Sequence, residues 1–290
     1  NFDGPELFSA LRGDAGPEQM QKCRDFVLHL ALCHTVVVEQ LGSEKKLSAS
    51  SPDEAALVSA AAHFGIEFVN KQHSTVTLRD SFSGKQPKFE VLEVLEFSSA
   101  RKRMSVIVQE PGTGRIRLLS KGADSVMISL ISSADAQVLR ETQRHLEDHA
   151  NDGLRTLMLT EKTLDHAMYE DWSRRYRLAL VDLVELEKKE KELPNEIERL
   201  MSEIEVDMAL VGSTAIEDKL QDGVPKTIAD MGRAGIAVWV LTGDKEETAI
   251  NIAYACELFD TRTKVHILNL KNAHDASAVR RELQRNGGLA

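Results

Sequence analysis

Between residues 66 and 120 the chain alternates apolar and polar residues in one short run after another. A period of two places apolar side chains on one face of an extended strand, so each run predicts a half-buried β-strand. The runs are IEFVN, TVTLRD, KFEVLEVLEF, RMSVIVQE and RIRLLS. Turn sequences such as SGKQP and PGTG separate them, and PGTG between two alternating runs is a hairpin signal. Successive hairpins predict an antiparallel sheet.

Helical patterns flank these strands. The apolar run 23–40 predicts a buried helix. Ser51 suits an N-cap and Pro52 the first position of a second helix, which we expect to end at Gly65. A third helix is expected over residues 134–150, with a further strand, LRTLML, after it. Helices beside an antiparallel sheet indicate an α+β domain.

The two ends of this domain differ in composition. Residues 1–22 are rich in Gly and Pro and are expected to form a linker or a disordered terminus. The stretch 178–205 is strongly charged and predicts a helix that is broken near Pro194. Its apolar residues are spaced as on one helical face and are Ile197, Leu200, Met201 and Ile204. We expect the α+β domain to cover residues 23–205.

After Glu205 strand and helix patterns alternate along the chain. The apolar run MALVGSTAIED precedes a helix expected over 224–234, and the run IAVWVLTGD precedes a second helix, KEETAINIAYACEL. KVHILNL and ASAVRRELQRN predict one more strand and helix. Alternation with short loops is typical of βαβ units and a parallel sheet. Residues 206–290 are therefore expected to form an incomplete α/β, Rossmann-like segment.

Composition excludes several classes of protein. Lys and Arg number 36 and Asp and Glu 46, and the resulting net charge of −10 argues against a general nucleic-acid binder. The three cysteines, Cys23, Cys33 and Cys256, lack CxxC spacing, which fits a reducing compartment and excludes a thiolate zinc site. The longest apolar run, 26–38, is shorter than the roughly 20 residues that a membrane-spanning helix needs. We expect a soluble chain of cytosolic character.

Thr242, Gly243 and Asp244 follow the most apolar run of the chain. Ligands bind at the carboxyl ends of parallel strands, and the next helix offers a phosphate its free N–H groups. The threonine hydroxyl can donate to a phosphoryl oxygen, and Gly243 allows close approach. Asp218 ends the preceding run and is expected near the same edge. In the plainer alternative, Thr242 only caps the helix and Asp218 is a solvated carboxylate.

A second set of candidates lies at strand ends of the antiparallel part. Lys121 is followed by Gly122 and can place its ammonium beside a flat ligand. Phe97 ends a strand, where an exposed ring can stack on a base. Arg155 can reach phosphate oxygens, and Glu54 can accept from an amino group. The alternatives are a surface lysine, a core phenylalanine and a carboxylate that serves only the helix dipole.

Two other clusters of polar residues are weaker indications of a functional site. His145 and His149 lie four apart on a predicted helix with Asp148 between them, similar to the H-x-x-E-H zinc pattern with Asp in place of Glu. The sequence offers no evident third ligand, and an exposed helix face explains these residues equally well, so we predict no metal site. Residues 101–103 are basic, but strand alternation sends Lys102 to the opposite face, which leaves a poor nucleic-acid patch.

Taken in order, the motifs resemble those of the P-type ATPases. They are SPDEAAL, LEFSSARKRMSV, SKGAD, GLRTL, TAIEDKLQ and VLTGDKEETAINIA, and the resemblance covers about residues 26–258. The variants KGAD, IEDKLQ and TGDKEETAIN are similar to the P4 branch, the phospholipid flippases. Calcium and sodium pumps typically carry an Asp-Pro-Pro-Arg-like element where this chain has residues 218–221, and the His-Pro element of the copper pumps is not found.

The resemblance implies roles for the candidates. Glu54, Phe97, Lys121 and Arg155 match ATP-contacting residues of a nucleotide-binding domain over residues 23–205. By this match Phe97 stacks on adenine and Lys121 lies beside the purine. Glu54 bonds the amino group and Arg155 reaches toward the phosphates.

The same resemblance assigns the rest of the chain. Thr242, Gly243 and Asp244 match the loop around the transferred phosphoryl group, in a partial, haloacid-dehalogenase-like phosphorylation domain over 206–290. The implied cofactors are ATP and, in the parent enzyme, Mg²⁺. The implied partners are the actuator, phosphorylation and transmembrane domains and an accessory subunit. The chain is then a cytosolic domain of a multi-pass membrane protein.

Several family elements are missing. The sequence has no DKTGT, which carries the phosphorylated aspartate, no GDGxND, no TGES-like loop and no membrane helix. We therefore expect a fragment that binds ATP weakly and cannot hydrolyse it. The parent would couple ATP hydrolysis, through an aspartyl-phosphate, to phospholipid flipping. One alternative is a stand-alone nucleotide-binding or regulatory module. A haloacid-dehalogenase-type phosphatase is another, but no Asp-x-Asp nucleophile loop is visible.

Overall fold

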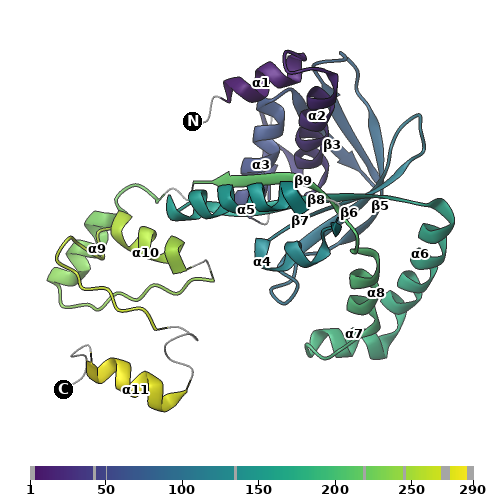
Figure 1. Ribbon diagram of the computed structural model, residues 1–290. Coiled ribbons are helices and arrows are strands. Elements are labelled where there is room, and N and C mark those ends of the chain that lie inside the picture. The colour runs from purple at the N-terminus through teal and green to yellow at the C-terminus, as the bar shows by residue number, and fades with distance from the viewer. Residues whose placement is uncertain are drawn as a thin grey trace. The chain divides into compact units, whose positions relative to one another are not determined.

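The computed structural model describes residues 4–41, 44–49, 51–133, 136–217, 220–243, 246–268 and 275–285. The chain divides into two compact units, Asn1–Asp218 and Lys219–Ala290 (Figure 1).

The first unit is built on a seven-stranded sheet in which neighbouring strands follow one another along the chain. All six strand pairs are antiparallel, which confirms the antiparallel sheet predicted from the period-two pattern. Its strands are β3 (Ile66–Gln72), β4 (Thr75–Asp80), β5 (Lys88–Leu95), β6 (Arg103–Gln109), β7 (Ile116–Gly122), β8 (Arg155–Leu164) and β9 (Ala209–Ile216). The PGTG sequence joins β6 to β7, as expected for a hairpin. A separate two-stranded sheet holds β1 (Val37–Leu41) and β2 (Glu44–Ser48).

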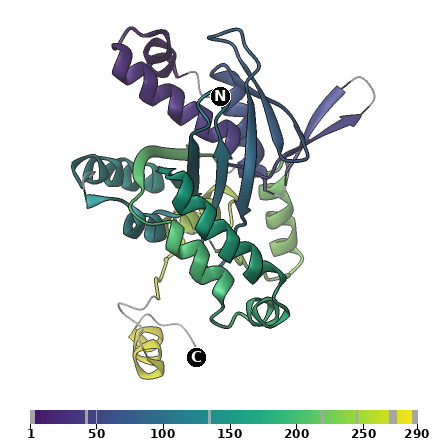
Figure 2. The same ribbon diagram turned by 90° about the vertical axis from the view of Figure 1, so that its right-hand side faces the viewer.

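Helices cover both faces of the sheet (Figure 1). One face packs against α1 (Pro5–Arg12), α2 (Pro17–Leu32) and α3 (Pro52–His63). The other face carries α4 (Asp124–Met127), the 3₁₀ turn η1 (Ile128–Leu130), α5 (Ala136–Asn151), α6 (His166–Val181) and α8 (Glu196–Ile204), with α7 (Leu183–Glu190) joining α6 to α8. Figure 2 shows α6 and α8 crossing in front of the strands.

Successive residues of β7 show how the two cores are separated. Leu119 packs in the core shared with α2 and α3, whereas Leu118 packs in the core shared with α6 and α8. Alternate side chains of a strand point to opposite faces, so β7 contributes to both cores. The same rule assigns Lys121, two residues beyond Leu119, to the α1–α3 face.

Two helix predictions are confirmed in detail. Ser51 caps α3, since its hydroxyl accepts a hydrogen bond from the backbone N of Asp53 at 3.2 Å, and Pro52 is the first helical residue. The charged stretch 178–205 breaks near Pro194 as expected, since α7 ends at Glu190 and α8 begins at Glu196, but it also breaks at Asp182, between α6 and α7. The expected apolar face of α8 is buried against the sheet.

The prediction of a linker or disordered terminus over 1–22 is wrong from Pro5 onward. Here Gly and Pro delimit helices instead of marking a loop. Pro5 and Pro17 begin α1 and α2, and Gly13 ends α1 in the left-handed conformation with φ of 94°. Leu11 is buried in the core beside α2, so α1 is a packed part of the unit.

The single helix predicted over 23–40 is also wrong in its second half. The helix α2 ends at Leu32, and Val37 already belongs to β1. The segment between them contains Thr35 and Val36, and β-branched side chains lose χ1 freedom in a helix but fit an extended strand. A buried helix and a buried strand are equally apolar, so hydrophobicity alone does not distinguish a helix from a strand in this run.

The run MALVGSTAIED does not open a parallel sheet. Its strand, β9, pairs antiparallel with β8 and so completes the first unit. After α8 the chain passes close to β8, since Lys162 of β8 donates to the carbonyl oxygen of Val206 at 2.8 Å, and pairing of β9 with β8 satisfies backbone groups that an open edge would expose. The first unit therefore runs to Asp218, while its division into named functional domains stays a prediction.

The second unit contains three helices in its described ranges, α9 (Val224–Arg233), α10 (Glu246–Ala255) and α11 (Ala276–Arg285), which agree with the predicted ones. No residue in those ranges is in a strand, so the Rossmann-like segment is not confirmed. In the run predicted as a buried strand, Trp239 is 85% and Leu241 is 94% exposed. A strand needs neighbours for its backbone groups, and the strand expected to precede this one has joined the other sheet.

No helix in the ranges that the structure describes is both long and apolar enough to cross a bilayer.

Candidate functional site

The register of the sheet brings three predicted site residues to one end of it. Lys121 on β7 pairs with Met104 on β6 and with Leu159 on β8. Phe97 follows the last residue of β5 by two positions, and Arg155 is the first residue of β8. In an antiparallel sheet the end of β5, the start of β6, the end of β7 and the start of β8 lie side by side at the same end of the sheet.

Glu54 reaches this edge from α3. The Nζ of Lys121 lies 2.8 Å from the Oε1 of Glu54, and each residue is only 7% exposed. The other carboxylate oxygen, Oε2, accepts from Thr35, at 2.7 Å from the hydroxyl and 3.3 Å from the backbone N. Both oxygens of Glu54 therefore have partners, and the buried ammonium is neutralised.

The protonation state of Glu54 follows from its neighbours. Burial by itself raises the pKa of this carboxyl. The Lys121 ammonium and the hydrogen bonds from Lys121 and Thr35 oppose burial and lower the pKa below its ordinary value. Glu54 is therefore an ionised acceptor at neutral pH, able to bond a donor on a ligand.

A glycine after Lys121 is required by the close approach of two strand ends. A Cβ on Gly122 would lie 2.5 Å from the Cβ of Arg103 and 2.7 Å from the carbonyl oxygen of Lys102. Any side chain there would push β6 and β7 apart. Gly122 thus allows the tight pairing that holds Lys121 in place.

Arg155 joins the same group through α3. Its Nη1 lies 3.4 Å from the Oδ1 of Asp53, the residue next to Glu54. Lys121 and Arg155 therefore contact consecutive carboxylates in the first turn of α3. Phe97 is 63% exposed, which excludes the core phenylalanine considered from sequence alone. The structure thus joins Glu54, Lys121 and Arg155 by contacts and places Phe97 at their end of the sheet.

The remaining predicted residues lie in the second unit or outside the described residues. Thr242 and Gly243 are exposed residues of the second unit, in an irregular segment before α10. Asp218 and Asp244 lie outside the described residues. The role of these four stays a prediction.

Sequence reasoning missed two residues of the site, Thr35 and Asp53. Asp53 stands beside Glu54 in the SPDE motif, so its proximity was available from the sequence. The role of Thr35 could not be predicted, because this residue falls in a run that was expected to be helical. Thr35 contacts Glu54 only because α2 ends at Leu32.

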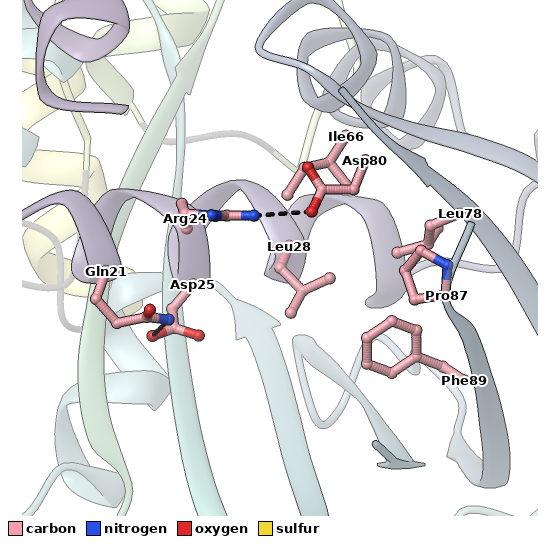
Figure 3. Close-up of a pocket in the computed structure, with 9 residues that line it drawn as sticks. All are labelled: Gln21, Arg24, Asp25, Leu28, Ile66, Leu78, Asp80, Pro87 and Phe89. Atoms are coloured by element: carbon pink, nitrogen blue, oxygen red, sulfur yellow. Dashed lines mark hydrogen bonds and ion pairs between the residues drawn. The ribbon is translucent and has the colours of Figure 1, made fainter. Parts of the chain in front are cut away.

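A cavity of about 240 Å³ lies at the opposite end of β5 (Figure 3). Arg24 of α2 lines it, with its Nη2 2.7 Å from the Oδ2 of Asp80. Leu28, Leu78 and Phe89 supply apolar walls. None of the predicted site residues lines this cavity, so it is separate from the candidate site.

The described residues contain no group of three or more His, Cys, Asp or Glu side chains that could hold a metal ion. His145 and His149, the metal-like pair of the sequence, are both exposed on α5.

Comparison with known proteins decides the family. The sequence model described as P-type ATPase, cytoplasmic domain N, matches residues 22–223. The chain belongs to the P-type ATPase family. The prediction made from the ordered motifs is thereby confirmed, and the matched range contains the candidate residues Glu54, Phe97, Lys121, Arg155 and Asp218.

Relatives of this P-type ATPase chain share the words "phospholipid-transporting ATPase" in their names. The chain is 46% identical to "Phospholipid-transporting ATPase DNF1" of Chaetomium thermophilum over 95% of the chain and 17% of the relative. It is 44% identical to "Phospholipid-transporting ATPase IC" of Xenopus tropicalis over 90% of the chain and 20% of the relative. With "Phospholipid-transporting ATPase ID" of Homo sapiens the identity is 42%, over 98% and 22%. The chain thus spans less than a quarter of the length of these relatives.

Two buried histidines on the Lys121 side of the sheet predict an acid sensitivity. Burial, reinforced by the charge of Lys121, lowers the pKa of His29 to about 3 and that of His34 to about 4. In the unfolded chain these rings become protonated near pH 6.5, whereas in the folded chain they stay neutral until the pH is much lower. The free energy of unfolding should therefore fall as the pH drops below 6.5, by up to about 1.4 kcal/mol per pH unit for each ring.

Urea unfolding at pH 7, 6 and 5 measures this loss. The lowered pKa of Glu54 adds a loss only below the ordinary carboxyl range, so it does not contribute above pH 5. The variant His29→Leu should show a shallower pH dependence than the natural chain. A free energy of unfolding that stays constant between pH 7 and 5 would contradict the prediction.

Proposed function

We propose that this chain is the nucleotide-binding part of a phospholipid-transporting P-type ATPase and that it binds ATP at the Lys121 end of its sheet. The supporting observation is the buried Lys121–Glu54 ion pair, flanked by Arg155 and by the exposed ring of Phe97. Phe97 would stack on adenine, Lys121 would lie beside the purine, and Glu54 would accept from the amino group. Arg155 would reach toward the phosphates.

The charges of this site suit a nucleotide in an acidic protein. The chain carries a net charge of −10, so an anion must be held by a few local cations. Lys121 and Arg155 provide them at one edge of the sheet. Since Asp53 and Glu54 partly neutralise both, the attraction for the phosphates is moderate, which is consistent with weak binding.

The whole enzyme lies beyond this chain, which spans less than a quarter of its relatives. We propose that the parent is a multi-pass membrane protein whose cytosolic part includes this chain. There ATP hydrolysis through an aspartyl-phosphate would drive phospholipid flipping. Mg²⁺ would act with the nucleotide's phosphates in the parent enzyme, held mostly by residues outside this chain. The accessory subunit and the role of Thr242, Gly243, Asp218 and Asp244 around the transferred phosphoryl group belong to the same proposal.

Titration of ATP, ADP and GTP into the 290-residue chain, followed by amide chemical shifts, tests the site. Phe97→Ala is expected to weaken ATP binding about tenfold, since loss of base–aromatic stacking costs about 1–3 kcal/mol. GTP should bind more weakly than ATP, because its carbonyl oxygen would face the acceptor Glu54. Phe82→Ala is the matched control, an exposed ring in the turn after β4 at the other end of β5.

Equal ATP affinity in the natural chain and Phe97→Ala would overturn the assignment of the site. The same sample, incubated with Mg²⁺ and ATP, is expected to release no inorganic phosphate above background. Measurable turnover would contradict the view that this part of the enzyme binds nucleotide without hydrolysing it.

A further inference from the structure

A buried charge cluster lies on the face of the sheet opposite Lys121. Glu205, the residue after α8, is completely buried. Its Oε1 accepts from the Nη2 of Arg101 and from the hydroxyl of Ser105, each at 2.5 Å. Its Oε2 accepts from the Nε of Arg103 at 2.8 Å. Ser105 is in turn 2.6 Å from the hydroxyl of Ser120 on β7.

Stability alone does not explain this cluster. It holds two guanidinium groups against one carboxylate, and all three side chains are buried. Removing charges from water is costly, and well-packed apolar residues of similar volume are often as stabilising as a buried ion pair. What an arginine offers, and an apolar residue does not, is a rigid fork that bonds two acceptors in fixed directions.

The guanidinium of Arg101 links Glu205 to the loop between β5 and β6. While Nη2 bonds Glu205, Nη1 donates to the carbonyl oxygen of Glu96 at 2.7 Å. Glu96 immediately precedes Phe97. The loop is closed by Ser98, whose hydroxyl accepts from the backbone N of Arg101 at 3.2 Å. A chain of hydrogen bonds thus runs from the buried carboxylate to the peptide that carries the exposed ring.

We propose that Arg101 and Glu205 are positioning residues that hold Phe97 in the orientation required to stack on the nucleobase. Phe97 itself is largely exposed, so its position depends on the backbone of the loop. A loop already fixed in its bound conformation loses less entropy when the ligand binds. This inference rests on the proposed ATP site and adds to it a support from the opposite face of the sheet.

Arg101→Lys tests the role, because lysine keeps the charge beside Glu205 but cannot bond Glu205 and Glu96 together as the planar fork does. ATP affinities are measured by titration for the natural chain, for Phe97→Ala, for Arg101→Lys and for the double variant. Arg101→Lys should weaken ATP binding severalfold. Phe97→Ala, which costs about tenfold in the natural chain, should cost less than about twofold in the Arg101→Lys background.

Glu205→Gln gives a second route to the same coupling, since it removes the carboxylate and leaves Arg101 in place. Arg175→Lys is the matched control, because Arg175 also pairs with a glutamate, Glu203, but on the exposed side of α6. The control should leave both the ATP affinity and the effect of Phe97→Ala unchanged.

The outcomes separate the two proposals. If Phe97→Ala costs the same in all backgrounds, the positioning role is wrong while the ATP site stands. If the natural chain binds no ATP, or Phe97→Ala has no effect in it, the ATP site itself is overturned. Loss of the Phe97 effect in Arg101→Lys and Glu205→Gln, but not in Arg175→Lys, supports the positioning role.

Discussion

Replacement of Glu205 by alanine is expected to lower the free energy of unfolding of the first unit by about 3–5 kcal/mol. The change leaves Arg101 and Arg103 buried without their carboxylate and the hydroxyl of Ser105 without its acceptor. A buried charge that has lost its partner cannot recover hydration without opening the structure. Such a loss is a large fraction of the total stability of a domain, which is about 5–15 kcal/mol.

Urea unfolding followed by tryptophan emission measures this effect. Trp172 is buried on the same face, with its Nε1 donating to the carbonyl oxygen of Leu200 at 2.8 Å, so its emission reports α6 and α8. Trp239 belongs to the second unit and is replaced by phenylalanine in all samples. Glu203→Ala is the control, since that residue pairs with Arg175 at the surface. A loss no larger than that of the control would contradict the buried-charge argument.

The cluster around Glu205 also shows where sequence reasoning reaches its limit. Residues 101–103 are visible as a basic cluster, and Lys102 is exposed between two buried arginines as expected, but it lies before β6 with a φ of 49°, so strand alternation is not the cause. Their partner is about a hundred residues away, at the end of a helix. Nothing local to Glu205 distinguishes it from the other acids of a strongly charged stretch. Only the folded sheet brings these charges together.

The same distinction holds for the fold. The period-two pattern predicts antiparallel strands because side-chain alternation is a local property of each strand. The partner of a strand is not local, so the run that forms β9 was expected in a parallel sheet and instead pairs with β8. Similarly, Glu54 and Lys121 were found through motifs, whereas their direct contact and its support by Thr35 required the structure.

The second large effect is expected from Lys121→Met, which should reduce ATP binding by about 100-fold or more and destabilise the first unit by about 3–5 kcal/mol. The variant removes the cation that neutralises Glu54 and leaves that carboxylate buried with Thr35 as its remaining partner. Stability and binding fall together in this variant, so by itself it does not show that Lys121 contacts the nucleotide.

The double variant Glu54→Gln with Lys121→Met, compared with Glu54→Gln alone, separates the two effects. With the carboxylate replaced by a neutral amide that still accepts from the hydroxyl of Thr35, no buried charge remains unpaired. The free energy of unfolding should recover by about 2 kcal/mol or more relative to Lys121→Met, whereas ATP binding should stay lost. Lys88→Met, an exposed lysine at the other end of β5, is the control and should change neither quantity. If ATP binding returns along with stability in the double variant, Lys121 serves the fold alone and does not contribute to nucleotide binding.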